Sequence, residues 1–385
     1  MTPTAPKDNR GFLRGTVLTP DDLAPDGVLA FEADRIVYAG PRAGFDPSGW
    51  PEAVPVPEGA LILPGLVDLH CHGALGRDFT TADDGGARHA AAFLHASGTT
   101  TLLASTVPAP RAELLAAAAR LGALAREGMV AGIHTEGPFL SPARPGALDP
   151  ASLLPPDPGL VDDLLAASES ELVTMTYAPE LPGAEDLVDL LVSRGITPSL
   201  GHTDADDATA AASLEFAREE MEEAGFDGYA PRPTVTHLFN GMPPLHPRSP
   251  GAAAAGLRAA RRGEAVLEVI ADGAGLDPAM LRTVFELAGG DNVALVSAAM
   301  PAPGEAGGTA TLLQCLARAV AAGIPLADAV RSATVVPADV LRLADEVGAL
   351  RRGLRADALV VGPDLELHAV LRCGSWLPAP DSLGK

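Results

Sequence analysis

The feature that most limits the fold of this chain is the alternation of two kinds of segment between about residues 60 and 346. Eight short apolar segments are typical of buried β-strands, namely Leu61–Leu69, Thr99–Ser105, Met129–Thr135, Leu172–Ala178, Ile196–Gly201, Thr234–Leu238, Ala265–Ala271 and Asn292–Ser297. Between them lie segments with helical spacing, among them Ala87–Ala96, Arg111–Arg126, Ala184–Arg194, Ala208–Ala224 and Pro278–Leu287. Strands that alternate with helices form parallel sheets. Eight strands over this length predict a closed (β/α)₈ barrel before a doubly wound open sheet.

The two ends of the chain contain short strand-like segments and turns instead of helical spacing. These segments are Gly11–Leu18, Gly27–Phe31 and Arg35–Gly40 near the N-terminus, and Asp357–Gly362 and Leu367–Leu371 near the C-terminus. We predict that residues 1–59 and 346–385 form one small satellite domain, and that residues 60–345 form the barrel.

Composition excludes several classes of function. The chain has 50 Asp and Glu against 27 Lys and Arg, a formal net charge of -23, which repels nucleic acid and anionic membranes. Its 3 cysteines are too scattered for a disulfide framework, and no apolar run resembles a signal peptide or a membrane span. We therefore predict a cytoplasmic protein without nucleic-acid or membrane partners, in which local groups hold any anionic substrate.

Side chains that can bind a metal stand at the carboxyl ends of four predicted strands. The first strand ends in His70 and His72, the third in Glu136, the fifth in His202 and the sixth in His237. Residues two apart in an extended strand point to the same side, and the carboxyl ends of barrel strands surround one mouth. Any one of these histidines alone could equally be a hydrogen-bonded core residue or a metal ligand. Ligand-type residues at four strand ends together favour a metal site.

Histidine nitrogen combined with one carboxylate suits Zn²⁺ or Fe²⁺ better than Ca²⁺ or Mg²⁺. We predict one or two divalent ions, with zinc preferred. A catalytic metal activates water and polarises a carbonyl group, which favours hydrolysis of an amide or related bond. The alternative is a metal site without catalysis. The ligands of such sites usually hold a small loop closed and do not line a barrel mouth.

Other polar residues belong to the same region. An imidazole and a guanidinium two positions apart, His246 and Arg248, suit a phosphate or carboxylate group of a substrate, and a solvated loop is the equal alternative. His134 either shares the face of Glu136 or is a core residue. The remaining histidines are predicted to be structural, and they are His89, His95 and His368.

Five motifs, in order along nearly the whole chain, resemble the N-acetylglucosamine-6-phosphate deacetylases of the amidohydrolase superfamily. They are Pro64–Gly73, His134–Pro142, Gly201–Ala205, Thr236–His246 and Gly348–Asp357. The resemblance implies a metal-dependent barrel, a small β-sandwich built from both chain ends, a homodimer, and hydrolysis of the amide of an N-acetyl amino sugar phosphate.

The resemblance also assigns roles to residues. Glu136, His202 and His237 are then the principal zinc ligands, while His70 and His72 line the site or hold a second ion. Asn240 and Arg248 help to bind the sugar phosphate. Many related binuclear hydrolases instead bridge their metals with a carboxylated lysine on the fourth strand, but the only lysines here are at the chain ends, Lys7 and Lys385.

Three positions depart from the resembled family. Ala298, in Val296–Met300, stands where the family has an aspartate that acts as general base and then as general acid. Leu148 and Gly275 stand where the family has histidines that contact the substrate. Loss of a positioned acid/base slows catalysis by ~10²–10⁴-fold, and loss of an oxyanion donor by ~10²–10³-fold.

Three hypotheses follow from these departures. The chain is a deacetylase-like hydrolase with impaired or altered activity, or a homologue that binds a ligand without turnover, or a hydrolase of another amide. In the last case proton transfer falls to the metal hydroxide alone or to a nearby carboxylate, with Asp204, Asp272 and Glu305 as candidates.

Overall fold

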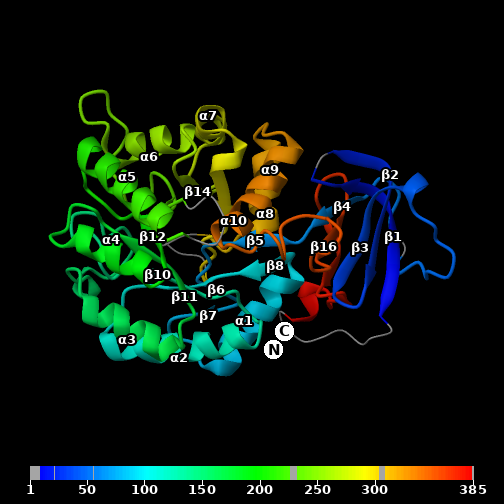
Figure 1. The fold of residues 1–385 in the computed structure, drawn as a ribbon, viewed down its shortest axis with the longest axis horizontal. Coiled ribbons are helices and arrows are strands. Elements are labelled where there is room, and N and C mark those ends of the chain that lie inside the picture. The colour runs from blue at the N-terminus through cyan, green and yellow to red at the C-terminus, as the bar shows by residue number, and fades with distance from the viewer. Residues whose placement is uncertain (1–8, 21, 55, 226–231, 303–307, 384–385) are drawn as a thin grey trace.

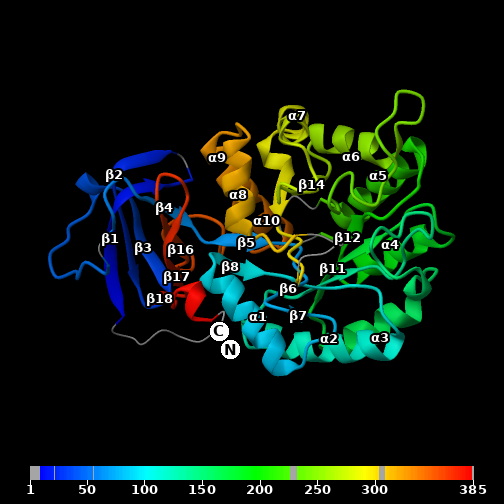
Figure 2. The same cartoon turned by 180° about the vertical axis from the view of Figure 1, so that it is seen from behind.

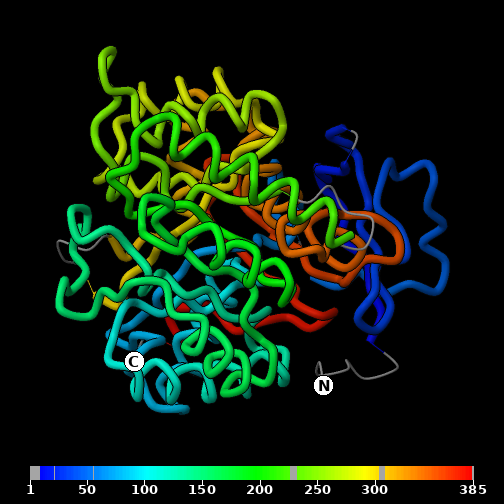
Figure 3. Tube along the Cα trace, turned by 60° about the vertical axis from the view of Figure 1, so that its left-hand side comes forward, coloured from blue at the N-terminus to red at the C-terminus, as the bar shows by residue number. Residues whose placement is uncertain are grey.

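The computed structural model describes residues 9–20, 22–54, 56–225, 232–302 and 308–383, which form a helix-covered barrel beside a separate β-sheet (Figures 1 and 2). The orange helices α8 and α9 lie between the rest of the barrel and the blue N-terminal strands (Figures 1 and 3). None of the described helices is long and apolar enough to cross a membrane.

The barrel strands follow one another in chain order. Seven of them, β9 to β15, form one parallel sheet, and β5 pairs in parallel with β8. Their bounds are β5 (Leu66–Asp68), β8 (Thr99–Leu102), β9 (Ala104–Thr106), β10 (Ile133–Glu136), β11 (Leu172–Tyr177), β12 (Thr197–Leu200), β13 (Thr234–Val235), β14 (Val266–Ile270) and β15 (Val293–Val296). Only Leu103 separates β8 from β9, so they are two halves of one barrel strand. The predicted fold class is confirmed.

The first and last barrel strands meet through the residues that follow them. The Ala298 amide donates a hydrogen bond to the His70 carbonyl at 2.8 Å, and the His72 amide donates to the Ala299 carbonyl at 2.9 Å. The buried carboxylate of Asp68 accepts from the Ser297 amide at 3.2 Å and so joins the same two segments. These bonds therefore close the barrel at the level of His70 and His72.

Ten α-helices are described, and those between barrel strands cover the outside of the barrel. Aspartates cap several of them, as Asp83 does by accepting from the Gly86 amide at the start of α1. The helices are α1 (Asp84–Ala96), α2 (Arg111–Arg126), α3 (Pro158–Ser168), α4 (Ala184–Ser193), α5 (Asp207–Glu223), α6 (Gly251–Arg261), α7 (Pro278–Ala288), α8 (Leu312–Ala321), α9 (Leu326–Ser332) and α10 (Val335–Val340). A two-stranded hairpin, β6 (Gly73–Ala74) and β7 (Arg77–Asp78), directly follows His72.

The end of the barrel opposite the strand carboxyl ends is filled with apolar side chains. Val67, Leu103, Val266 and Ala294 from the strands form one buried cluster with Val336 of α10. The barrel interior is therefore solid on that side, as in other barrels of this type.

Strands from both ends of the chain share the second sheet, whose order is β18-β17-β16-β4-β1-β2-β3. They are β1 (Arg10–Leu18), β2 (Leu23–Glu32), β3 (Arg35–Pro41), β4 (Leu61–Pro64), β16 (Ala358–Val361), β17 (Leu367–Arg372) and β18 (Ser375–Trp376). The central contact is the antiparallel pair β4 and β16, in which Ile62 faces Val360. Phe31 of β2 packs against Trp376 of β18, five positions away in this order, with ring centroids 6.5 Å apart, so the sheet folds over on itself around one core, in agreement with the predicted small β-sandwich domain.

One predicted strand needs correction, because Leu61–Leu69 is two strands in different sheets. β4 belongs to the small sheet and β5 to the barrel, so the small sheet extends to Pro64 instead of ending at residue 59. Gly65 separates them, and a Cβ atom there would lie 2.2 Å from Thr100 Oγ1. Only glycine lets the backbone pass this closely between the two bodies.

Buried charges hold the two bodies together behind Gly65. Arg355 Nε donates to Asp357 Oδ2 at 2.7 Å, and its guanidinium also donates to Thr101 Oγ1. Asp357 accepts a further bond from the Cys373 amide at 2.7 Å. Arg372 donates to the Thr100 carbonyl at 2.9 Å.

Removal of the Asp357 carboxylate should strongly destabilise the protein. Asp357→Ala leaves the buried guanidinium of Arg355 without its counter-ion, and breaking a buried pair costs about 3–5 kcal/mol of unfolding free energy. Urea unfolding followed by circular dichroism measures this. Glu127→Ala, which breaks the exposed pair with Arg88, is the control and should leave the midpoint unchanged. Equal midpoints for the two variants would contradict this role of Asp357.

Candidate metal centre

The structure brings together the five residues that we selected as metal ligands. His70 and His72 follow β5, Glu136 is the last residue of β10, His202 follows β12, and His237 follows β13. All five are buried, with residue exposures from 0% to 6%. Their ligand atoms form two groups, His70 with His72 and Glu136, and Glu136 with His202 and His237, and within each group the atoms lie within 4.8 Å of one another.

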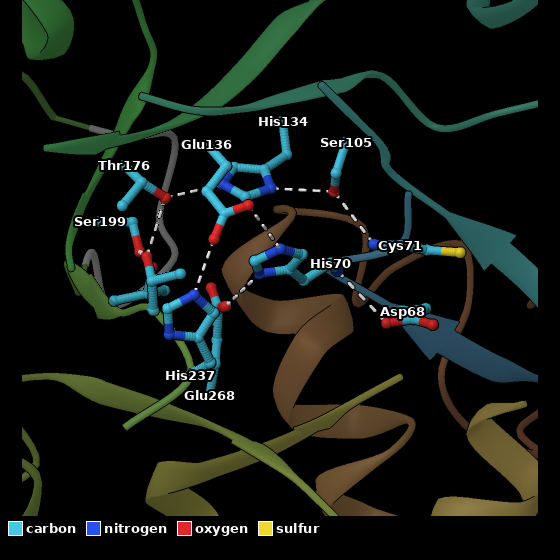
Figure 4. A network of polar contacts seen from close by, with 12 residues as sticks. Asp68, His70, Cys71, Ser105, His134, Glu136, Thr176, Ser199, His237 and Glu268 are labelled. Carbon is cyan, nitrogen blue, oxygen red and sulfur yellow. Dashed lines mark hydrogen bonds and ion pairs between the residues drawn. The ribbon is translucent and has the colours of Figure 1, made fainter. Parts of the chain in front are cut away.

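The carboxylate of Glu136 lies between two pairs of histidines, and Figure 4 shows one member of each pair, His70 and His237. Its Oε1 atom is 2.7 Å from His237 Nε2 and 3.0 Å from His202 Nε2. Its Oε2 atom is 3.2 Å from His72 Nε2 and 3.8 Å from His70 Nε2. One carboxylate therefore offers one oxygen to each histidine pair.

The hydrogen bond at Nδ1 of a histidine ring determines whether its Nε2 atom, which faces Glu136, carries a proton or a lone pair. His202 Nδ1 donates to the Arg144 carbonyl at 2.8 Å, so the neutral ring presents the lone pair of Nε2 to Glu136. A lone pair and a carboxylate oxygen 3.0 Å apart repel each other unless a proton or a metal cation lies between them. The donor set therefore fits a divalent cation.

The same argument applies to the first histidine pair. His70 Nδ1 lies 3.3 Å from Glu268 Oε2 (Figure 4). His70 Nε2 lies 2.9 Å from His72 Nε2. Burial alone would lower the pKa of His70, but hydrogen bonds to Glu136 and Glu268 outweigh it and raise that pKa to about 10. Burial would raise the pKa of Glu136, but hydrogen bonds from the four histidines hold it well below its ordinary value. Without a metal, a proton takes the place of a cation at this pair.

Glu268 is a residue of this site that we did not predict. It lies in the middle of β14, is 1% exposed, and contacts His70. Metal-bound histidines usually donate their second ring nitrogen to such a carboxylate, which orients the ring. The sequence does contain a signal, since a lone carboxylate within the apolar segment Val266–Ile270 is costly to bury without a partner.

His134 lies beside the ligands but belongs to a separate hydrogen-bond network. Its Nδ1 is 2.9 Å from Ser105 Oγ and its Nε2 is 2.8 Å from Thr176 Oγ1. Its ring packs edge-on against that of His70, with centroids 4.5 Å apart. The Thr176 hydroxyl continues to Thr236 at 2.9 Å (Figure 4). His134 is thus a buried residue that supports His70.

A cavity of about 560 Å³ opens above the five residues. The three positions that depart from the resembled family, Leu148, Gly275 and Ala298, all line it, and so does Asn240. The other two predicted substrate-binding residues do not, because His246 and Arg248 lie in an exposed turn in which the Arg248 amide donates to His246 Nδ1 at 3.2 Å. The three residues that differ from the resembled family therefore line the same cavity as the five predicted metal ligands.

The backbone around Ala298 has an unusual conformation. Ala298 has a φ angle of 42°, in the left-handed region that L-residues rarely adopt. Aspartate and asparagine are several-fold enriched among the residues that do. The backbone conformation at this strand end therefore suits the acidic side chain that this chain lacks.

Comparisons with known proteins show the family to which the chain belongs. The model of a family described as the amidohydrolase family matches residues 61–379. The chain is 28% identical over 388 residues to an N-acetylglucosamine-6-phosphate deacetylase of Vibrio furnissii, covering 93% of this chain and 92% of the relative. A relative from Bacillus subtilis, which carries the same name, is 29% identical over 300 residues, covering 75% of this chain and 70% of the relative.

Solved structures show the same relationship. N-acetyl-D-glucosamine-6-phosphate deacetylase from Mycobacterium smegmatis is 36% identical, with a TM-score of 0.84 over 96% of this chain and 100% of that chain. A mutant of the M. smegmatis enzyme, in which one aspartate is replaced by alanine, was solved in complex with N-acetyl-D-glucosamine-6-phosphate. It is 34% identical, with a TM-score of 0.85 over 96% of this chain and 99% of that chain.

Zinc binding should release a proton from the His70 pair. Because the pKa of His70 in the metal-free protein is about 10, a proton competes with zinc throughout the neutral range. The affinity should therefore increase about tenfold for each pH unit between about pH 6 and pH 8 for each proton displaced. Competition with a chromophoric chelator at several pH values measures this.

A control for the zinc titration is His368→Gln, which changes an exposed histidine on β17 and should leave the affinity unchanged. Glu136→Gln should lower it sharply, because both histidine pairs lose their shared anion. Affinity that does not depend on pH would contradict the competition between zinc and the His70 proton.

Proposed function

This chain belongs to the amidohydrolase family and is a relative of its N-acetylglucosamine-6-phosphate deacetylases, and on that basis we propose that it hydrolyses the amide bond of an N-acetyl amino sugar phosphate. The observation that carries the proposal is the buried carboxylate of Glu136 between two histidine pairs at the floor of an open cavity. A histidine that serves only the packed core does not usually lie beside a buried carboxylate and an open cavity, and a cluster of surface histidines is not buried.

The metal is proposed to be zinc. Glu136, His202 and His237 would hold one ion, and His70 and His72 with Glu136 would hold a second. Bound zinc lowers the pKa of a water molecule and polarises a carbonyl group. Around it, Arg144 and Glu268 fix the ring protons of His202 and His70 on the side away from the ion.

The sugar phosphate needs a positive group near the rim. Among the described residues that line the cavity there is no lysine or arginine. Arg248 on the adjoining turn is the candidate, because Arg144, which is nearer along the chain to the cavity residue Gly146, is paired with Asp204. The Asn240 amide lines the cavity and is placed to bind the sugar. A homodimer would bring a second copy of such rim residues to the mouth, and we propose this assembly.

The alanine at position 298 favours a second candidate function, which is binding without turnover. The cavity and the metal ligands do not depend on a carboxylate at this position. The M. smegmatis mutant with an aspartate replaced by alanine still holds N-acetyl-D-glucosamine-6-phosphate. A chain of this family can therefore bind that compound after losing an aspartate, and only a turnover measurement separates the two functions.

The central test compares the native protein with Ala298→Asp after zinc loading. Release of acetate from N-acetylglucosamine 6-phosphate should be slow for the native protein and faster by ~10²–10⁴-fold for the variant, as for other positioned acid/base groups. A chelator should abolish both activities. Since the φ angle of 42° suits aspartate, the variant should fold normally.

Ala298→Asn is the matched control, because its side chain has the same shape but cannot accept a proton at neutral pH. An equal gain from asparagine would show that the effect is steric. Binding of the sugar phosphate by the native protein with no acetate released under any metal would refute the hydrolase and leave the binding function.

A further inference from the structure

Of the two candidate carboxylates that the structure describes, Asp204 and Asp272, one lines the cavity. Asp204 is exposed and its carboxylate is 2.7 Å from the guanidinium of Arg144, and Glu305 lies outside the described residues. Asp272 lines the cavity together with His70, His72 and Ala298. Resting on the function proposed above, we propose that Asp272 is the catalytic proton carrier of this site.

The register of the sheet places Asp272 next to the position that lacks a carboxylate. β14 and β15 are parallel neighbours in which Ile270 faces Val296. Asp272 and Ala298 each follow that pair by two residues, and adjacent strands lie about 4.8 Å apart. A carboxylate has therefore been kept at the same level of the barrel mouth, one strand away.

The surroundings of Asp272 hold one oxygen and leave the other available. Oδ1 accepts from the amides of Ala274 at 2.9 Å and Gly275 at 3.1 Å. Oδ2 lies against Gly308, where an added Cβ atom would meet it at 3.0 Å, closer than is usual for a Cβ contact. The exposed Arg318 of α8 lies near the same loop, with its Nε 3.5 Å from the Cβ position of Gly273. Glycine at position 308 therefore avoids a close contact with Oδ2, and no described residue donates a hydrogen bond to this oxygen.

The proposed step balances as follows. The attacking water gives one proton to Asp272 Oδ2 while its oxygen bonds to the acyl carbon. When the carbon–nitrogen bond breaks, the same proton passes from Oδ2 to the departing nitrogen, which leaves as an amine. The acid and the amine then exchange one more proton in solution, and the products are a carboxylate and an ammonium ion. Asp272 is again a carboxylate at the end of the cycle.

Asp272→Asn separates this chemical role from a structural one. Asparagine keeps an oxygen that can accept from the amides of Ala274 and Gly275, so the loop keeps its shape, but it cannot carry the proton. Turnover of N-acetylglucosamine 6-phosphate should fall ~10²–10⁴-fold, with zinc content and KM unchanged. Asp204→Asn is the control and should keep the native kcat.

A double variant makes the test specific. Adding Ala298→Asp to Asp272→Asn should restore turnover, because a carboxylate returns to the mouth one strand away, whereas damage to the loop at residue 272 would not be repaired from residue 298. Chelator-sensitive turnover that survives in Asp272→Asn would overturn the role of Asp272 and leave the proposed function intact. No native turnover, together with turnover by Ala298→Asp, would overturn both.

Discussion

The buried carboxylate of Glu136 is the interaction on which the rest of this site depends. Two histidine pairs face it, one at each oxygen, and burying such an anion is costly unless it is paired with positive charge or a metal. The partners come from strands that are far apart in the sequence, so β12 and β13 must join β10 in the sheet, and the segment after β5 must lie beside them, before Glu136 has all four. The bonds between the Ala298 and His70 segments close the barrel at the same level.

The barrel and its ligand residues could be predicted because both depend on local patterns. Apolar strands alternate with helices, and the ligands stand at strand ends, so position in the chain nearly determines position in space. The break at Gly65 could not be predicted, because it depends on Thr100 and Asp357, which are distant in sequence. Helix α6 is not among the predicted segments, because all buried residues of this helix except Leu257 are alanine or glycine and give no clear apolar periodicity.

The five residues proposed to hold a metal and the residues on the cavity walls differ in how far they match the deacetylases that the chain resembles. The five residues beneath the cavity agree with the motifs of that resemblance, while Leu148, Gly275 and Ala298 on its walls do not. The five are coupled through the carboxylate of Glu136, so the loss of a histidine removes one partner of a buried charge. The three wall residues are uncharged, so no buried charge depends on their side chains.

The pairing of β4 with β16 also determines when this protein can fold. Ile62 needs Val360 as its neighbour, so during synthesis β4 has no partner on that side until the chain has been made past residue 361. Only Gly65 separates β4 from the barrel strand that leads to His70. β4 therefore gains this neighbour only after the whole barrel sequence, including His70 and its partners, has been synthesised.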